Sequence, residues 1–223
     1  DWRRARAFAW MTALVYFDKL FQIPIILTRQ IYGTRFRHIL DTLMEAEATT
    51  YPIISDIRDF FISEAARIQD GGVEYTFSQE WLSIYWPCDE YVFIQLTIEN
   101  KIDKLFSEMT ALLKDLITKE SINVPYKVIN DAMNLNRALI KQPMEKKNIS
   151  VHASFDVMDY YYKVIDGIDC DLQWVPTTYN IDRSNETWEI FQDWCQEVVW
   201  YGNKKGAYLY GNKAVEKDLA GHH

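Results

Sequence analysis

Apolar side chains spaced three and four residues apart run through the first two thirds of the chain, and this spacing constrains the fold more than any other feature. Residues at this spacing share one face of an α-helix, so each such stripe predicts an amphipathic helix. The clearest helix is predicted over 102–118, with an inner face of Ile102, Leu105, Phe106, Met109, Leu112, Leu113 and Leu116. We therefore expect residues 1–143 to form a multi-helix array with short connections.

Capping and breaking residues divide this array. Thr50 is expected to cap the helix that begins near Pro52, and Gly71-Gly72 to end it. Residues 73–77 favour a β conformation but are isolated, so they are interpreted as an extended connector. A short helix is predicted from Ser78 to Tyr85, before the next helix begins at 86–90.

The pattern changes after Pro143. Residues 148–154 favour a strand, 155–167 a helix, and 172–181 a second extended stretch in which Pro176 indicates an edge position. A two-stranded ribbon between 148–154 and 176–181 follows from this order. The predicted fold class is mainly α, with a smaller α+β segment over 144–219 that packs on the array as part of one continuous domain.

A final helix is predicted from Trp188 into a tail that ends near Gly211. Its apolar positions cover most of its circumference: Trp188, Phe191, Trp194, Cys195, Val198, Val199, Trp200 and Tyr201. A helix this apolar is expected to be wrapped by other elements, so we expect it to be central to the fold.

Charge and cysteine content exclude several function classes. A net charge of −8 argues against a general nucleic-acid binder, which would present a basic surface. Cys88, Cys170 and Cys195 are far apart, so they match no zinc, iron–sulfur or disulfide pattern and suit a reducing cytoplasm. No apolar run reaches the ~18 residues that would indicate a membrane span.

Both ends of the chain suggest that it is a piece of a longer protein. Residue 1 is Asp rather than Met and lies directly within a helical pattern. The last residues, 220–223, are interpreted as the start of a purification tag. An exposed surface that faces the rest of a parent protein would favour self-association of the isolated piece.

Two groups of residues are candidates for binding. Lys204 and Lys205 could hold an anionic group or an acidic partner surface, or could complement the dipole of the preceding helix. An aromatic cluster in the α+β segment could line a pocket for a planar ligand, or pack against the remainder of a parent protein. Its members are Tyr160, Tyr161, Trp174 and Tyr179, with Tyr162 beside them.

No catalytic or metal-binding constellation is specific enough to name a reaction. His38 and His152 each lack a second ligand at metal-binding spacing. Asp56 and Asp59 share a helix face and could hold magnesium in a helical enzyme, but a matching acidic cluster on a facing helix is absent from the sequence. An exposed helix face is the simpler interpretation of this pair.

Three motifs resemble the region that follows the catalytic barrel in cobalamin-binding radical SAM proteins, a group similar to the anaerobic magnesium-protoporphyrin monomethyl ester oxidative cyclase. The motifs are Ile31-Tyr-Gly-Thr-Arg-Phe-Arg-His38, Trp86-Pro-Cys-Asp-Glu-Tyr91 and Val199-Trp-Tyr-Gly-Asn-Lys-Lys-Gly-Ala-Tyr-Leu-Tyr-Gly211. The resemblance spans most of the chain, but its motifs are structural rather than catalytic.

The resemblance implies a parent enzyme with a cobalamin domain and a barrel that binds a 4Fe–4S cluster and S-adenosylmethionine. This chain has neither the cysteine triplet nor the cobalamin-binding motif of such a parent, so no catalytic or cofactor-binding role is carried over to any residue. The implied function is a non-catalytic C-terminal accessory domain that covers the barrel or shapes its substrate site. The alternative is a self-contained helical protein-interaction module.

Overall fold

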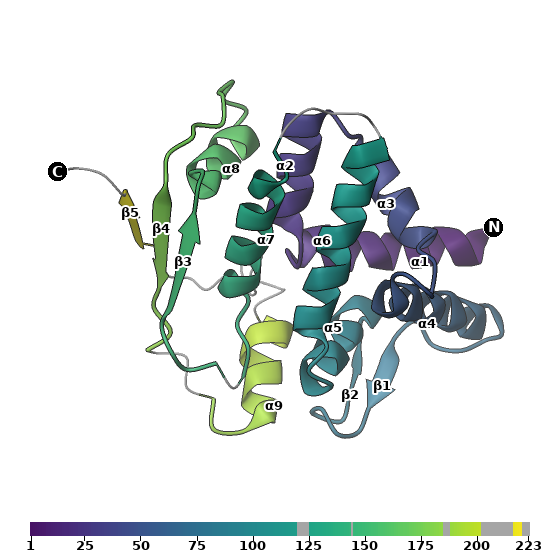
Figure 1. Cartoon of the computed structure of the whole chain (residues 1–223). Coiled ribbons are helices and arrows are strands. Elements are labelled where there is room, and N and C mark those ends of the chain that lie inside the picture. Colours follow the sequence, from purple (N-terminus) through teal and green to yellow (C-terminus); the bar gives the residue numbers. More distant parts are fainter. Residues whose placement is uncertain (120–124, 144, 185–187, 202–215, 220–223) are drawn as a thin grey trace.

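The computed structural model describes residues 1–119, 125–143, 145–184, 188–201 and 216–219 (Figure 1). The α-helices are α1 (Trp2–Thr12), α2 (Gln22–Tyr32), α3 (Phe36–Met44), α4 (Pro52–Gln69), α5 (Cys88–Ile98), α6 (Ile102–Lys119), α7 (Lys127–Leu139), α8 (Val157–Ile165) and α9 (Phe191–Trp194). Two π-helical segments, η1 (Ala13–Phe17) and η2 (Cys195–Trp200), continue α1 and α9. The strands are β1 (Thr76–Ser78), β2 (Ile84–Trp86), β3 (Ile149–Ala153), β4 (Thr177–Ile181) and β5 (Glu216–Leu219). The predicted class, mainly α with a small β segment, is confirmed.

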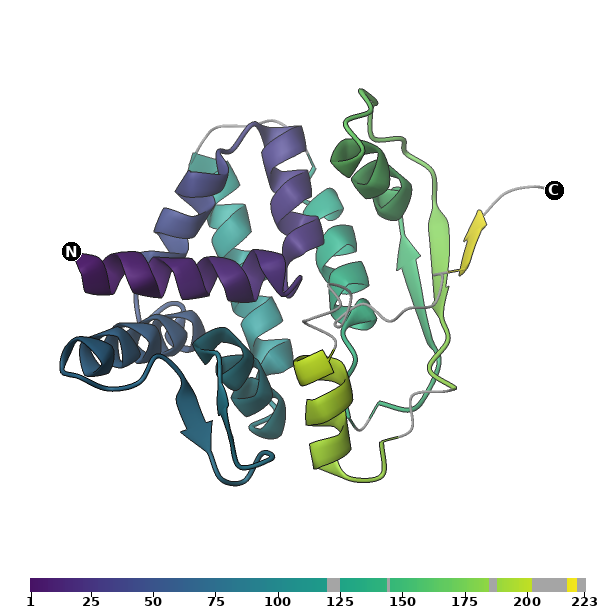
Figure 2. The same ribbon diagram turned by 180° about the vertical axis from the view of Figure 1, so that it is seen from behind.

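Buried apolar side chains form two hydrophobic clusters that meet at α2 and α7. The larger cluster lies among α1, α3, α4, α5 and α6, and the smaller lies between α2 and α7 on one side and α8 with the β3–β4 ribbon on the other. Ile25 of α2 belongs to the larger cluster, whereas Ile23 and Leu27 belong to the smaller. Figure 2 shows this arrangement from behind, with α8 and the sheet on the opposite side of α2 from α3 and α4.

The predicted stripe of α6 is buried throughout, as its spacing requires. The start of α4 differs from the prediction. Its N-cap residue is Tyr51 rather than Thr50, and the Tyr51 side chain makes no capping hydrogen bond. The carboxylate of Glu108 on α6 instead accepts the N–H groups of Ile53 and Ile54, at 3.0 to 3.1 Å. A residue from another helix therefore replaces the expected local cap.

The prediction of a helix over 78–85 is wrong, and so is the prediction that 73–77 form an isolated extended connector. β1 and β2 pair in an antiparallel hairpin in which Phe77 lies opposite Tyr85. The Oγ of Ser78 accepts from the N–H of Trp81 and so caps the turn instead of a helix. Leu82 and Ser83 have positive φ angles of 66° and 51° in that turn, a conformation that helical periodicity does not predict.

The ribbon predicted in the α+β segment is confirmed, with Ile149 opposite Ile181 and Ala153 opposite Thr177. The edge position predicted for its second strand is wrong, because β5 pairs with the other side of β4. Pro176 precedes β4 by one residue, so it removes no hydrogen bond from the ladder.

The final helix starts later in the chain and is more peripheral than predicted. It begins at Phe191 rather than Trp188, and one of its faces is exposed through Gln192, Asp193, Gln196 and Glu197. Its buried face, which includes Trp194 and Val198, contacts the larger cluster. Polar residues between the apolar ones therefore give it an ordinary amphipathic character, and the expectation of a central, fully wrapped helix is wrong.

Among the described residues, no single helix combines the length and the apolar character that a membrane crossing requires. The α1–η1 stretch and α2 satisfy both conditions only as a pair, and the pair is bent by 92° at the break between them.

Candidate functional site

The lysines predicted to contact an anion or a partner, Lys204 and Lys205, lie outside the described residues. Their role stays a prediction. The described part of the chain before them includes η2, whose residue Trp200 packs edge-on against Trp86, with ring centroids 5.5 Å apart. η2 therefore lies beside the N-terminus of α5.

The aromatic residues predicted in the α+β segment have different environments. Tyr160, Tyr161 and Tyr179 are buried, whereas Trp174 is 61% exposed. The Tyr179 hydroxyl donates to Asp156 at 2.9 Å and accepts from the Met158 N–H, and the Tyr161 hydroxyl donates to Gln22 at 2.6 Å. Two of the three buried tyrosines thus use their hydroxyls to join elements of the protein.

Trp174 packs on the surface instead of joining these tyrosines. Its ring lies 4.7 Å from that of Phe155, and the ammonium of Lys127 lies 5.8 Å from its centroid. An exposed indole next to a cation can contribute to an interface, since aromatic faces attract cations and apolar groups alike.

The stretch Trp86–Tyr91, one of the three resemblance motifs, builds the core around the start of α5. Trp86 is fully buried and donates from Nε1 to the Trp81 carbonyl at 3.1 Å. Tyr91 stacks on Phe60, with centroids 5.6 Å apart. Burial raises the pKa of the Cys88 thiol to about 11, so it is protonated at neutral pH and is a poor nucleophile. The motif therefore contributes packing.

A buried carboxyl pair lies at the junction of η1 and α5. Asp89, in the first turn of α5, is hydrogen-bonded to Asp18, and both residues are less than 10% exposed. Burial raises the pKa of Asp89, while the bonds to Asp18 and to backbone N–H groups and the charge of Arg6 act in the opposite direction. No sequence pattern indicates the pairing of Asp18 with Asp89, because it depends on the tertiary fold.

Neither His38 nor His152 lies in a metal-binding arrangement. His152 Nδ1 is 2.9 Å from the Thr178 hydroxyl across the β3–β4 ribbon. Within the ranges that the structure describes, no group of three or more His, Cys, Asp or Glu side chains could hold a metal ion. Asp59 of the proposed Asp56/Asp59 pair accepts a 2.8 Å bond from Arg58, whereas Asp56 faces a groove.

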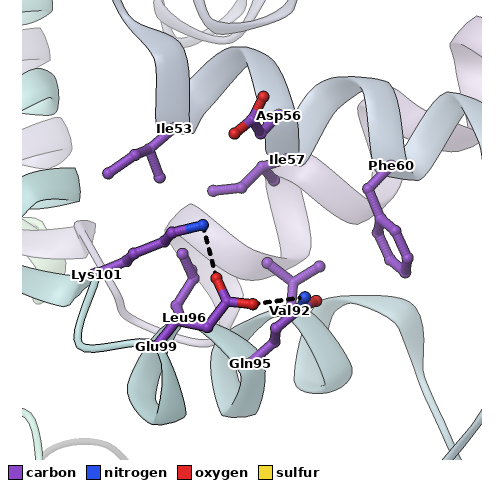
Figure 3. Close-up of a pocket in the computed structure, with 9 residues that line it drawn as sticks. All are labelled: Ile53, Asp56, Ile57, Phe60, Val92, Gln95, Leu96, Glu99 and Lys101. Atoms are coloured by element: carbon purple, nitrogen blue, oxygen red, sulfur yellow. Dashed lines mark hydrogen bonds and ion pairs between the residues drawn. The ribbon is translucent and has the colours of Figure 1, made fainter.

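This groove lies between the N-terminal half of α4 and the C-terminal half of α5 and has a volume of about 180 Å³ (Figure 3). Apolar side chains from both helices line it, among them Ile53 and Ile57 of α4 and Val92 and Leu96 of α5. Figure 3 shows the ring of Phe60 at one end of the groove and the Lys101 side chain at the other.

Charged groups stand on both rims of the groove. Lys101 Nζ lies 2.6 Å from Glu99 Oε2, and Gln95 Nε2 donates to Glu99 Oε1 at 2.9 Å. The bond to Lys101, and after it the bond to Gln95, lowers the pKa of Glu99. The ion pair with Glu99 in turn raises the pKa of Lys101, and the charge of Asp56 adds to this increase. Asp56 is exposed on the opposite rim, and within the described part of the chain no hydrogen bond or ion pair joins its carboxylate to another residue.

A second surface feature is the outer face of the β1–β2 hairpin, which we call the aromatic face. Phe77 and Tyr85 are paired across the strands with centroids 5.1 Å apart, and Tyr75 precedes Phe77 by two residues. These three side chains are 48 to 52% exposed, whereas Ser78 and Trp86 on the inner face are buried. The helix predicted over 78–85 does not predict this face. The alternation of aromatic and polar residues over 75–78 is the signal in the sequence that could have indicated it.

No family model matches the chain, and no curated protein sequence matches it.

Proposed function

We propose that this chain is a non-catalytic accessory domain of a cobalamin-dependent radical SAM enzyme, similar to the oxidative cyclases, and that it covers the catalytic barrel or shapes its substrate site. The observation that carries the proposal is the aromatic face. Phe77 and Tyr85 form an ordered apolar surface next to the motif Trp86–Tyr91 by which the chain resembles that family. Exposed apolar surface of this kind marks sites of protein–protein contact.

The cofactors belong to the parent in this proposal. The 4Fe–4S cluster, S-adenosylmethionine and cobalamin would be held by its barrel and its cobalamin domain, and no residue of this chain is assigned to them. A cytoplasmic location is part of the same proposal, because the three free cysteines suit a reducing compartment.

A self-contained interaction module is the second candidate. The aromatic face would serve it equally well, since Phe77, Tyr85 and Tyr75 present the same surface to any protein partner. The two candidates differ in whether the partner is part of the same polypeptide.

The metal content of the native protein, purified anaerobically from its source, separates the two candidates. Iron at cluster stoichiometry together with cobalt is expected if the chain belongs to a cobalamin-dependent radical SAM enzyme. A native protein no longer than this chain, with neither metal, would leave the interaction module.

Hydrogen exchange then tests the contact itself. Amides of 74–86 are expected to exchange more slowly in the native protein than in the isolated chain, because the parent would cover the aromatic face. Replacing Phe77 and Tyr85 by serine should remove this difference, whereas Tyr162→Ser, at an aromatic residue 53% exposed on α8, should preserve it. Equal exchange in the native protein and the isolated chain would argue against docking through this face.

A further inference from the structure

We propose that the groove between α4 and α5 is a receptor for one arginine side chain of a partner protein. The proposal goes beyond the accessory role, because it depends only on the groove and holds for any protein that supplies the arginine. It rests on the size of the groove, its apolar lining and the charges on its rims (Figure 3).

The groove has room for a single long side chain. Its volume of about 180 Å³ lies well below the roughly 300–1,000 Å³ of pockets that hold whole small molecules. Ile57, Val92 and Leu96 offer an apolar surface for the methylene stem of the occupant. Long basic side chains bury their stems along such surfaces while their charged ends stay near water.

The rims favour a cation. Asp56 and Glu99 carry two negative charges against the single positive charge of Lys101, so the lining residues have a net charge of −1. Both carboxylate oxygens of Glu99 are bonded already, to Lys101 and Gln95. Asp56 is therefore the carboxylate that would receive the incoming group, with Glu99 adding a favourable potential.

Arginine fits this arrangement better than lysine. Its planar guanidinium can bond a carboxylate through two parallel N–H groups and can also stack on an aromatic ring. Asp56 supplies the carboxylate, and Phe60, one turn further along α4, supplies a ring at the end of the groove.

The test is an NMR titration of the isotope-labelled 223-residue chain with a blocked five-residue peptide that has one central arginine between alanines. The matched probe carries citrulline, which has nearly the same shape as arginine but no charge. The arginine peptide is expected to shift the amide signals of 53–60 and 92–101 and to bind at least about tenfold more tightly than the citrulline peptide, because an interaction with a charged group is worth ~1.5–3 kcal/mol.

Three variants locate the effect. Asp56→Asn should weaken binding of the arginine peptide several-fold, whereas Asp166→Asn, which removes an exposed carboxylate at the C-cap of α8, should leave it unchanged. Lys101→Met should strengthen binding by about twofold, because it removes a like charge from the rim at the ~0.5 kcal/mol scale of an exposed ion pair. A gain of affinity cannot result from damaged folding, so this variant keeps the test valid if Asp56→Asn is poorly folded.

Equal binding of the arginine and citrulline peptides would overturn the proposal, as would signal shifts confined to residues outside the groove. Unchanged affinity in both Asp56→Asn and Lys101→Met would also overturn it. None of these results depends on the metal content of the native protein, so this proposal and the proposed function can fail separately.

Discussion

The side-chain Oδ1 of Asn136 accepts a 3.1 Å hydrogen bond from the backbone N–H of Ile23, 113 residues earlier in the chain. Its Nδ2 donates to the carbonyls of Lys19 and Leu20, at 3.2 and 2.9 Å. Asn136 is fully buried on α7, and in this way one amide satisfies backbone groups within the turn between η1 and α2 and at the start of α2. Buried backbone groups need such partners, because leaving them unpaired costs free energy.

Replacing Asn136 by leucine should lower the free energy of unfolding by about 3 kcal/mol, because it leaves buried donors and acceptors unsatisfied at a cost of ~1–3 kcal/mol each, offset in part by apolar burial. Urea unfolding followed by circular dichroism measures the change. Asn134→Leu, at an exposed position of the same helix, is the matched control and should stay within ~0.5 kcal/mol of the parent chain. Equal stability of the two variants would show that the Asn136 bonds contribute nothing.

The Glu108 carboxylate on α6 caps the N-terminus of α4, because it accepts hydrogen bonds from the N–H groups of Ile53 and Ile54. Glu108→Ala should reduce the unfolding free energy by about 1 kcal/mol, as loss of a capping side chain does, and hydrogen exchange at the start of α4 should become faster. Glu189→Ala removes an exposed carboxylate without a cap role and should change neither quantity. Faster exchange in both variants would mean that net charge, and not the cap, is responsible.

The raised pKa of Asp89 predicts a specific dependence of stability on pH. Because the folded pKa lies above the unfolded value of about 3.9, the native state binds more protons than the unfolded state between these two values. The pH-dependent cost of burying Asp89 is therefore absent below the unfolded pKa, and it grows as the pH rises from the unfolded pKa through the folded pKa.

Asp89→Asn should accordingly be more stable than the parent chain at pH 7, and this advantage should shrink as the pH falls towards 4. The measurement is the difference in unfolding free energy between the two proteins at each pH, which cancels the contributions of the other carboxylates. A difference that is constant from pH 4 to pH 8 would contradict the raised pKa.

The aromatic face predicts that the isolated chain self-associates. Phe77 and Tyr85 are about half exposed, and contiguous apolar surface favours burial against another molecule. Sedimentation velocity should detect concentration-dependent association, which the double replacement Phe77→Ser and Tyr85→Ser should abolish. A chain that stays monomeric at all concentrations and does not bind an apolar dye would rule out this surface as a driver of association.

The helices follow from local spacing, and the sequence therefore predicts them well. Every third or fourth residue of 102–116 is apolar, so only a helix buries them together, and all of them are buried in α6. The β3–β4 ribbon was predictable for a similar reason, since two segments rich in β-favouring residues flank the helix α8 in the sequence. The β1–β2 hairpin was not, because its turn depends on positive φ angles at Leu82 and Ser83, which leave no clear signal in residues other than glycine or asparagine.

For the candidate sites, the sequence by itself determined which residues carry charge and which are apolar, and it singled out Asp56. Only the tertiary structure decided that Asp56 faces Lys101 and Glu99 across a groove, because those residues belong to segments that become neighbours when α4 packs on α5. The same holds for Glu108 at the start of α4 and Asn136 at the start of α2. Each accepts a hydrogen bond from a backbone N–H group that has no partner within its own helix, and any nearby acceptor could have made this bond. Periodicity is a property of one segment, whereas a partner in space depends on how the segments pack, and that is settled by the burial of the whole chain at once.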